Sequence, residues 1–216
     1  MSVYAAGLSI LGLALIGAGS ATLTGVDLMH RWVAPPAIAV GASLLYLGAC
    51  YAFRRRPAGW AILPYSLAAI TALGLYRVVS REPFADEIAP RLWLGSAPLV
   101  FSGSLVARTG ATAVLNVTAE FGNLARLKLA YKRVAMLDGV APTAGQLSEA
   151  AAWAAEQYRA GGVVLVHCAQ GHGRSATTMA KLLLELGIEP DPDAAIARVS
   201  KARPGIKIGD KSKRLL

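Results

Sequence analysis

A cysteine and an arginine near residue 170 are spaced in a way that suits chemistry on an anion. Cys168 is followed by five residues and then by Arg174, within the segment VVLVHCAQGHGRSATT (163–178). The segment leaves an apolar run typical of a strand and enters a pattern typical of a helix. In such a loop the backbone N–H groups can surround a tetrahedral oxyanion, helped by the positive end of the following helix. The spacing therefore predicts a phosphate-binding loop.

The side chains in and beside this loop suggest how the chemistry is divided. A positive environment favours the thiolate of Cys168, which is the nucleophilic form of cysteine. Arg174 offers a planar, bidentate grip on phosphate oxygens. We expect the Ser175 hydroxyl to donate to the sulfur when it becomes the leaving group, and His167 to orient the loop from behind. The expected phosphate-binding residues are Ala169, Gln170, Gly171, His172, Gly173 and Arg174.

Other residues near the loop carry more than one interpretation. The His172 side chain either contacts the substrate or faces solvent. Asn116 and Glu120 are interpreted as structural or rim residues. No group of His, Cys, Asp and Glu shows the spacing of metal ligands, so we expect neither a metal nor another cofactor. The two cysteines, Cys50 and Cys168, are not expected to form a disulfide.

The surrounding segments predict the elements that must hold the loop. Strands alternate with helices, which is typical of an α/β fold with a central, mainly parallel sheet flanked by helices. The last strand is a continuous apolar run, as expected of a strand covered on both faces. A Thr143–Gln146 capping box opens the first helix. The predicted strands are 91–95, 110–118, 132–137 and 163–167, the predicted helices are 143–162, 174–187 and 191–202, and 80–90 is a polar lead-in.

The first 80 residues differ in composition from the rest of the chain. They hold five of the 22 Lys and Arg residues and one of the 13 Asp and Glu residues. Apolar stretches at 4–26, 32–53 and 58–79 each reach the ~20 residues that a helix needs to cross a bilayer. We therefore expect a helical transmembrane region at 1–80, in an integral membrane protein, followed by a catalytic domain at 88–216.

Charge does not decide the orientation of these predicted spans. Arg54–Arg56 would lie on one side of the membrane, and Arg31, Arg77 and Arg81 on the other. A cytoplasmic catalytic domain is favoured, because a functional thiol survives best in a reducing compartment and a basic domain is drawn to the anionic inner leaflet. The basic segment 126–133 is either a solvated face or a surface for anionic headgroups. Nucleic acid is not expected as a partner, because aromatic stacking residues are lacking beside the charge.

The loop and four other segments resemble the cysteine-dependent dual-specificity phosphatases, whose signature is His-Cys, five residues and Arg-Ser or Arg-Thr. The resemblance covers roughly 88–216 and implies the sheet-and-helix fold of that family. It also implies a phosphocysteine intermediate at Cys168 and an aspartate general acid, whose place Asp138 holds. The other matching segments are RLWLGS (91–96), VLNVTAE (114–120), AMLDG (135–139) and SKARPGI (200–206).

Together these features predict a membrane-anchored phosphatase of a bacterial type that hydrolyses phosphate monoesters. Anchoring raises the effective concentration of substrates in or on the membrane, which favours a phosphorylated lipid headgroup. A phosphoprotein substrate, with the same chemistry, is the first alternative. The others are a phosphate-binding membrane module without catalysis, and sulfur or arsenate transfer by the loop cysteine. The joint presence of Cys168, Asp138 and Arg174 argues against the module, and sulfur or arsenate transfer does not need Asp138.

Overall fold

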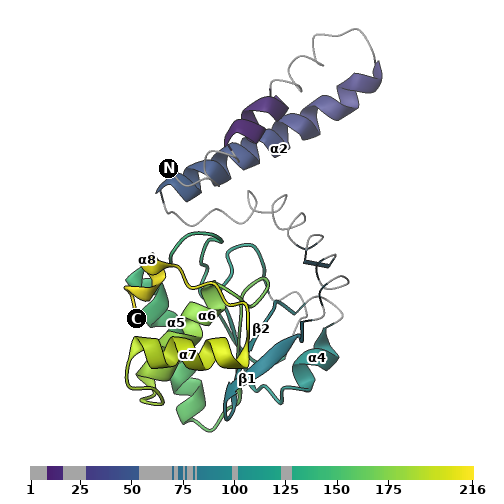
Figure 1. Ribbon diagram of the computed structural model, residues 1–216. Coiled ribbons are helices and arrows are strands. Elements are labelled where there is room, and N and C mark those ends of the chain that lie inside the picture. The colour runs from purple at the N-terminus through teal and green to yellow at the C-terminus, as the bar shows by residue number, and fades with distance from the viewer. Residues whose placement is uncertain are drawn as a thin grey trace. The chain divides into compact units, whose positions relative to one another are not determined.

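The computed structural model describes residues 9–16, 28–53, 70, 73–74, 76, 80, 82–98, 102–122 and 128–216. The chain forms two compact units, Met1–Thr71 and Ala72–Leu216. In the first unit, residues 9–16 are helical and α2 spans Leu28–Phe53 (Figure 1). These two helices approach closely at two glycines. A Cβ added to Gly12 or to Gly41 would lie 2.7 Å from the carbonyl oxygen of the other, so only residues without a side chain fit there.

The three predicted membrane spans coincide only partly with the described residues. The span predicted at 32–53 falls within α2, whereas those at 4–26 and 58–79 lie largely outside the described residues. Within the described ranges, no helix has both the length and the hydropathy needed to cross a membrane.

A five-stranded sheet forms the centre of the second unit, with the strand order β1-β2-β5-β3-β4. β1 is antiparallel to β2, and every other pair of neighbours is parallel, which confirms the prediction of a mainly parallel sheet. β1 lies in the segment predicted as a polar lead-in. Its sequence ADEIA is tolerated because an edge strand exposes one side to solvent. The strands are β1 (Ala85–Ala89), β2 (Leu92–Gly95), β3 (Ala113–Asn116), β4 (Ala130–Arg133) and β5 (Val164–His167).

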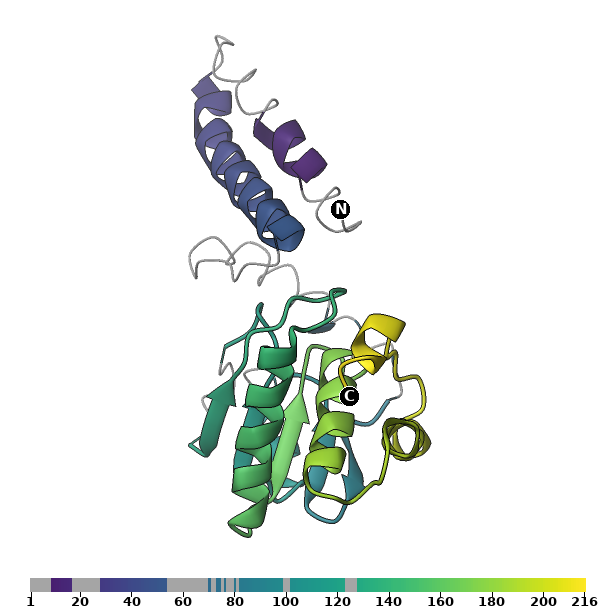
Figure 2. The ribbon, with the colours of Figure 1, turned by 90° about the vertical axis from the view of Figure 1, so that its left-hand side faces the viewer.

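The central strand β5 is buried along its whole length. The helices α5 (Ala144–Arg159), α6 (Arg174–Glu185) and α7 (Pro192–Ala202) lie on one face of the sheet (Figure 2). Val164 and Val166 pack in the larger core cluster, and Leu165 packs in a smaller cluster with Val106 of α4 (Gly103–Ala107). His167 pairs in register with the last residues of β2 and β3. The carboxyl ends of three neighbouring strands therefore meet beside residue 168.

Helices α5, α6 and α7 confirm the three helices predicted from the sequence. The capping box at the start of α5 is formed, with the Thr143 side chain accepting from the Gln146 N–H. Asp191 caps α7 in the same manner by accepting from the Ala194 N–H at 2.8 Å. The helices of this unit are α4 (Gly103–Ala107), α5 (Ala144–Arg159), α6 (Arg174–Glu185), α7 (Pro192–Ala202) and α8 (Asp210–Lys213).

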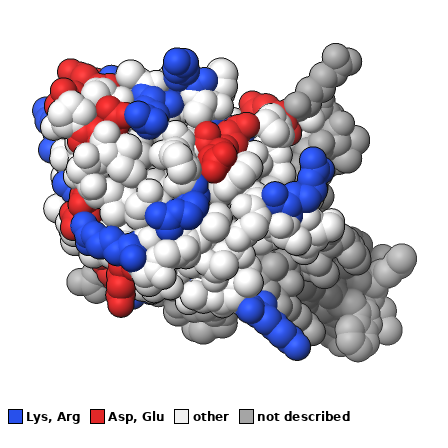
Figure 3. Space-filling view, turned by 90° about the horizontal axis from the view of Figure 1, so that it is seen from below, with Lys and Arg blue, Asp and Glu red and all other residues white. Residues whose placement is uncertain are grey.

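Charged side chains of both signs lie on the face of the molecule that Figure 3 shows. On the face that Figure 3 shows, Lys and Arg side chains alternate with Asp and Glu side chains and do not gather into a broad field of one sign. In the basic segment predicted as either a solvated face or a headgroup surface, Lys132 pairs with Glu149 at 3.0 Å. The face in Figure 3 therefore carries mixed charge, and Lys132 is paired with an acidic side chain.

Candidate active site

The predicted phosphate loop joins the central strand to a helix. Cys168 follows β5 directly, and Arg174 is the first residue of α6. The Cys168 side chain is 3% exposed. Its Sγ accepts hydrogen bonds from the Gly171 N–H at 3.3 Å and from the Ser175 hydroxyl at 3.1 Å. The sulfur therefore lies inside the loop, beside two donors.

Burial and the neighbouring groups act in opposite directions on the pKa of Cys168. Burial raises this pKa, whereas the Arg174 guanidinium and hydrogen bonds from Ser175 and the Gly171 N–H lower it, and the net pKa is below the ordinary value for a thiol. A nearby positive charge and donated hydrogen bonds both favour the charged form of an acid. The loop therefore favours the thiolate of Cys168, which is the nucleophilic form.

The carbonyl groups of the loop are held by groups outside it. The Ala169 carbonyl accepts from the Ala97 N–H at 2.9 Å, and the His172 carbonyl accepts from the Lys207 N–H at 2.8 Å. The two carbonyls between them, those of residues 170 and 171, accept from the Arg203 guanidinium at 3.1 and 3.0 Å. In a trans peptide the C=O of one residue and the N–H of the next point in opposite directions. The N–H groups of residues 170–173 are therefore directed toward the inner side, as the bond from the Gly171 N–H to the sulfur illustrates.

Arg174 is held by two carboxylates that differ in burial. Its guanidinium donates to both oxygens of Glu120, at 2.6 and 2.7 Å, and to the Met136 carbonyl at 3.1 Å. The Asp138 carboxylate lies 3.0 Å from Nη2. The Glu120 side chain is 2% exposed, whereas that of Asp138 is 47% exposed. Glu120 thus fixes the arginine from within, and Asp138 reaches it from the solvent side.

The charge of Arg174 is secured by these partners. Burial lowers the pKa of Arg174, but the neighbouring Glu120, Cys168 and Asp138 raise it, and the net pKa is above the ordinary value. The guanidinium is therefore charged throughout the pH range in which proteins are folded. A permanent positive charge beside the sulfur is suited to holding a phosphate dianion.

Glu120 is presented by a turn that side chains of β3 and β4 stabilise. Asn116, the last residue of β3, donates to the Phe121 carbonyl at 2.9 Å and accepts from the Thr118 N–H and hydroxyl at 2.8 and 2.7 Å. Arg133, the last residue of β4, donates to the carbonyls of residues 118 and 119. Arg133 is exposed and at the same time supports this turn.

The interpretation of Glu120 as a structural or rim residue missed its contact with the arginine of the phosphate loop. A signal was present in the sequence. Glu120 follows β3 by a few residues, and β3 is parallel to the strand that carries Cys168. Because parallel strands end at the same edge of a sheet, an acidic residue just after the neighbouring strand belongs near the loop.

The structure brings together only some of the side chains predicted for the site. Cys168, Arg174, Ser175 and Asp138 lie within one network of contacts. His167 is buried, and its Nδ1 lies 3.2 Å from the Cys168 carbonyl oxygen, a contact that fits its predicted supporting role.

The His172 side chain contacts a carboxylate outside the loop. Its Nε2 lies 2.8 Å from Glu82 Oε2, and the side chain is 13% exposed. The side chain therefore contributes to the outer support of the loop. Among the described residues, no group of three or more His, Cys, Asp or Glu side chains could hold a metal ion.

The sequence is similar to phosphatases of known type. A family model described as "Polymorphic toxin system, DSP-PTPase phosphatase" matches residues 102–188. Human dual specificity protein phosphatase 2 is 35% identical over 118 residues, which make up 49% of this chain and 36% of that protein. The match thus spans little more than a third of that relative's length.

Solved structures resemble the second unit over nearly their whole length. The crystal structure of human DUSP28 is 27% identical with a TM-score of 0.57, and the match covers 62% of this chain and 90% of that chain. The structure of PTPMT1 in complex with PI(5)P is 23% identical with a TM-score of 0.54, covering 61% of this chain and 91% of that chain. At that identity the second likeness concerns the fold alone. The described second unit therefore has the α/β fold of these phosphatases.

Proposed function

We propose that this chain is a membrane-associated phosphatase of the dual-specificity type, whose substrate is a phosphorylated lipid headgroup. The comparisons indicate a cysteine-dependent phosphatase that hydrolyses phosphate monoesters. The proposal adds the roles of individual residues, the substrate class and the location. One observation carries the residue roles. The Cys168 sulfur, the Arg174 guanidinium and the Asp138 carboxylate lie at the same end of the sheet, within one network of contacts.

In the first step the Cys168 thiolate attacks phosphorus from the side opposite the leaving oxygen. A sulfur–phosphorus bond forms as the phosphorus–oxygen bond breaks, and the leaving oxygen takes the proton of the Asp138 carboxyl group. Arg174 and the inward N–H groups of residues 170–173 hold the remaining phosphate oxygens and stabilise the charge that they carry in the transition state. The exposed position of Asp138 beside Arg174 suits this transfer, because the leaving group lies on the solvent side.

In the second step water hydrolyses the phosphocysteine. The Asp138 carboxylate takes a proton from the water as its oxygen attacks phosphorus, the sulfur–phosphorus bond breaks, and inorganic phosphate is released. The sulfur leaves with the bonding pair as a thiolate. The Ser175 hydroxyl, 3.1 Å from Sγ, donates to that thiolate and so stabilises the leaving group.

The composition of the N-terminal region supports a substrate at the membrane. The first 80 residues hold one of the 13 Asp and Glu residues of the chain. Association of so apolar a region with a bilayer raises the effective concentration of lipid substrates around the attached phosphatase. PTPMT1, whose fold the second unit shares, was solved with the phospholipid PI(5)P. We place the catalytic unit on the cytoplasmic side, where a thiol stays reduced.

A phosphoprotein substrate is the second candidate. It is favoured by the 35% identity to human dual specificity protein phosphatase 2. The residues that act on phosphorus would be the same for both substrate classes, so the site described above does not separate them. The difference lies in what surrounds the phosphate, a headgroup at a bilayer or a peptide.

Phosphate release from the full-length chain, reconstituted with phosphatidylcholine vesicles, tests both parts of the proposal. The substrates are p-nitrophenyl phosphate, vesicle phospholipids that include PI(5)P, and phosphotyrosine and phosphoserine peptides. We expect kcat/KM for one of the phospholipids to exceed that for every peptide by at least about tenfold. Higher kcat/KM for a peptide would replace the lipid by the second candidate. Activity of the Cys168→Ser variant equal to that of wild type would contradict the phosphocysteine mechanism itself.

A further inference from the structure

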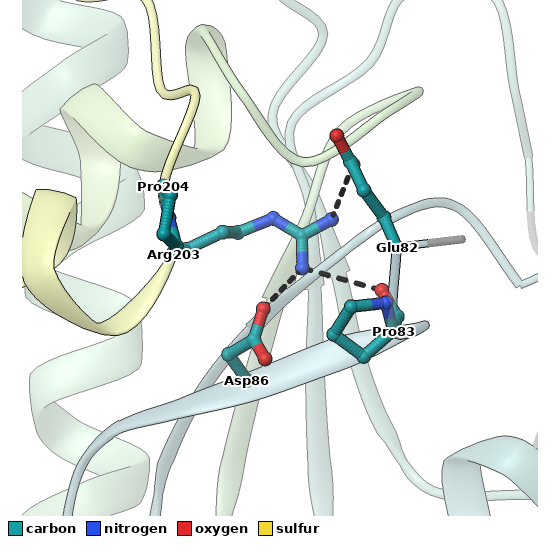
Figure 4. Close-up of a pocket in the computed structure, with 5 residues that line it drawn as sticks. All are labelled: Glu82, Pro83, Asp86, Arg203 and Pro204. Carbon is teal, nitrogen blue, oxygen red and sulfur yellow. Dashed lines mark hydrogen bonds and ion pairs between the residues drawn. The ribbon is translucent and has the colours of Figure 1, made fainter. Parts of the chain in front are cut away.

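We propose that Arg203 is a positioning residue for the phosphate loop and that it acts together with Asp86, Glu82 and His172. We call these four residues the outer clamp. The inference rests on the proposed function, because the loop must bind phosphate for its shape to matter. Figure 4 shows the Arg203 side chain directed at Glu82, Pro83 and Asp86, which lie in and just before β1.

The position of the Arg203 guanidinium is fixed by acidic partners. Arg203 directly follows the last residue of α7, and its side chain is 3% exposed. Nη1 donates to Asp86 Oδ2 at 2.5 Å and to the Pro83 carbonyl at 3.4 Å. Nη2 lies 3.7 Å from Glu82 Oε2. Because a buried charge is retained only where it is paired, these partners determine where the planar group lies.

The same guanidinium bonds two consecutive carbonyls of the phosphate loop. Nε donates to the Gly171 carbonyl at 3.0 Å, and Nη2 donates to the Gln170 carbonyl at 3.1 Å. With those oxygens held outside, the N–H groups of residues 171 and 172 are directed inward. If the carbonyls were released, they could turn toward the phosphate and repel it. Arg203 therefore sets the direction of two of the donors that meet the anion, without touching the anion itself.

Glu82 extends the clamp to a third residue of the loop. Its Oε2 lies 2.8 Å from His172 Nε2, so one carboxylate faces both the loop imidazole and the clamp arginine. The loop has little room to relax on this side. A Cβ added at Gly171 would lie 2.8 Å from the Gly95 backbone and 3.0 Å from Arg203 Nη2. Rotation of the loop peptides is therefore opposed by β2 and by Arg203.

A lysine cannot reproduce this contact. The guanidinium is a rigid fork that reaches Asp86 and both carbonyls at once, whereas an ammonium is a point charge on a flexible stem. A cavity of about 390 Å³ adjoins the clamp and is lined by Glu82, Pro83, Asp86, Arg203 and Pro204. This space allows a changed side chain to be accommodated without displacement of the sheet, so Arg203→Lys is a fair test.

The test compares the inhibition constant of inorganic phosphate for full-length variants, with p-nitrophenyl phosphate as substrate. We expect Arg203→Lys to raise this constant by about tenfold or more, because misdirected donors bind the anion poorly. Asp86→Asn should also raise the inhibition constant, but by a smaller factor. The matched control is Arg198→Lys, on the same helix. Arg198 pairs with Glu189 and is 42% exposed, and its substitution should leave the constant within about twofold of wild type.

Thermal unfolding separates positioning from a purely structural role. All kinetics are recorded well below the lowest unfolding midpoint, so that every variant is folded. If Arg203 were only structural, the folded variant would keep the wild-type inhibition constant, and that result would overturn the proposal. If Arg203→Lys does not fold, the inhibition constant of phosphate for Asp86→Asn is used instead. A wild-type value for that variant would overturn the proposal.

The failure of the proposed function would be visible separately. In that case wild-type protein would release no phosphate from any substrate. Calorimetric titration of the wild type and the same variants with inorganic phosphate would then still measure whether the clamp governs anion affinity. Equal dissociation constants for wild type and Arg203→Lys would overturn the clamp, and weaker binding by the variant would support it.

Discussion

Glu120 and Arg174 form a two-point contact, with hydrogen bonds of 2.6 and 2.7 Å between side chains that are at most 5% exposed. Such a buried pair adds little net stability over an apolar pair, but it fixes geometry. A phosphate entering the loop therefore meets an arginine that is already oriented. Orientation achieved during folding need not be repeated in each catalytic cycle.

The first prediction concerns this pair. Glu120→Gln keeps the shape of the side chain but leaves Arg174 without its buried counter-charge. We expect kcat/KM for p-nitrophenyl phosphate to fall at least about tenfold and the free energy of unfolding to fall by about 3 kcal/mol. Urea unfolding and steady-state kinetics provide the two measurements. Glu149→Gln, at the more exposed Lys132 pair, is the control and should change the free energy by less than about 1 kcal/mol. Wild-type values for Glu120→Gln in both assays would refute the positioning role.

The second prediction concerns the pH dependence of Cys168 alkylation. Because the pKa of Cys168 lies below the ordinary thiol value, its thiolate persists at lower pH, and alkylation slows only when the pH falls through the lowered pKa. Iodoacetate inactivation should therefore have a midpoint below the usual ~8.5. Ser175→Ala removes a donor to the sulfur and should move the midpoint to higher pH. A Cys50→Ala background leaves Cys168 as the only thiol. A wild-type midpoint at or above that of a free thiol would rule out the stabilised thiolate.

The third prediction concerns the leaving group. Asp138→Asn removes the carboxyl proton and should lower kcat about 100-fold or more on an alkyl phosphate, whose leaving oxygen is strongly basic. The loss should be smaller for p-nitrophenyl phosphate, because p-nitrophenolate is a weaker base. The ratio of the two losses is measured by steady-state kinetics on both substrates. Equal losses would show that Asp138 does not protonate the leaving oxygen.

The fourth prediction compares two glycines of the loop. Gly171 has a φ of +85°, and an added Cβ would lie 2.8 Å from the Gly95 backbone, whereas at Gly173 the nearest atom, the Lys207 carbonyl oxygen, would lie 3.6 Å away. Gly171→Ala should therefore lower the free energy of unfolding by about 2 kcal/mol or more. Gly173→Ala should change it by less than about 1 kcal/mol. Chemical unfolding of both variants makes the comparison, and equal effects would contradict the tight packing at Gly171.

Patterns local to one segment were the ones that the sequence could predict. The strand, loop and helix around Cys168 follow from a continuous apolar run, a glycine-containing loop and a helical pattern. The start of α5 follows from the Thr143–Gln146 capping box, which needs only four consecutive residues. The general order of strands and helices was predictable for the same reason, because each element carries its own periodicity.

Features that depend on contacts between distant segments were missed. β1 was overlooked because its polar sequence resembles a linker until its pairing with β2 is known. The role of Arg203 depends on residues 32 positions before it in the loop and 117 positions before it in β1. In each case the deciding partner lies outside the segment that was interpreted.

The location of β5 between β2 and β3 has a consequence for how the catalytic unit can change. The proposed reacting groups are gathered at one rim of the sheet, whereas the parallel strands begin at the opposite rim, near Leu92, Ala113 and Val164. Substitutions at that far rim are constrained by folding alone, since no phosphate is handled there. Insertions, tags or reporter groups are best attached on that side, because a modification there does not contact the groups that act on phosphate.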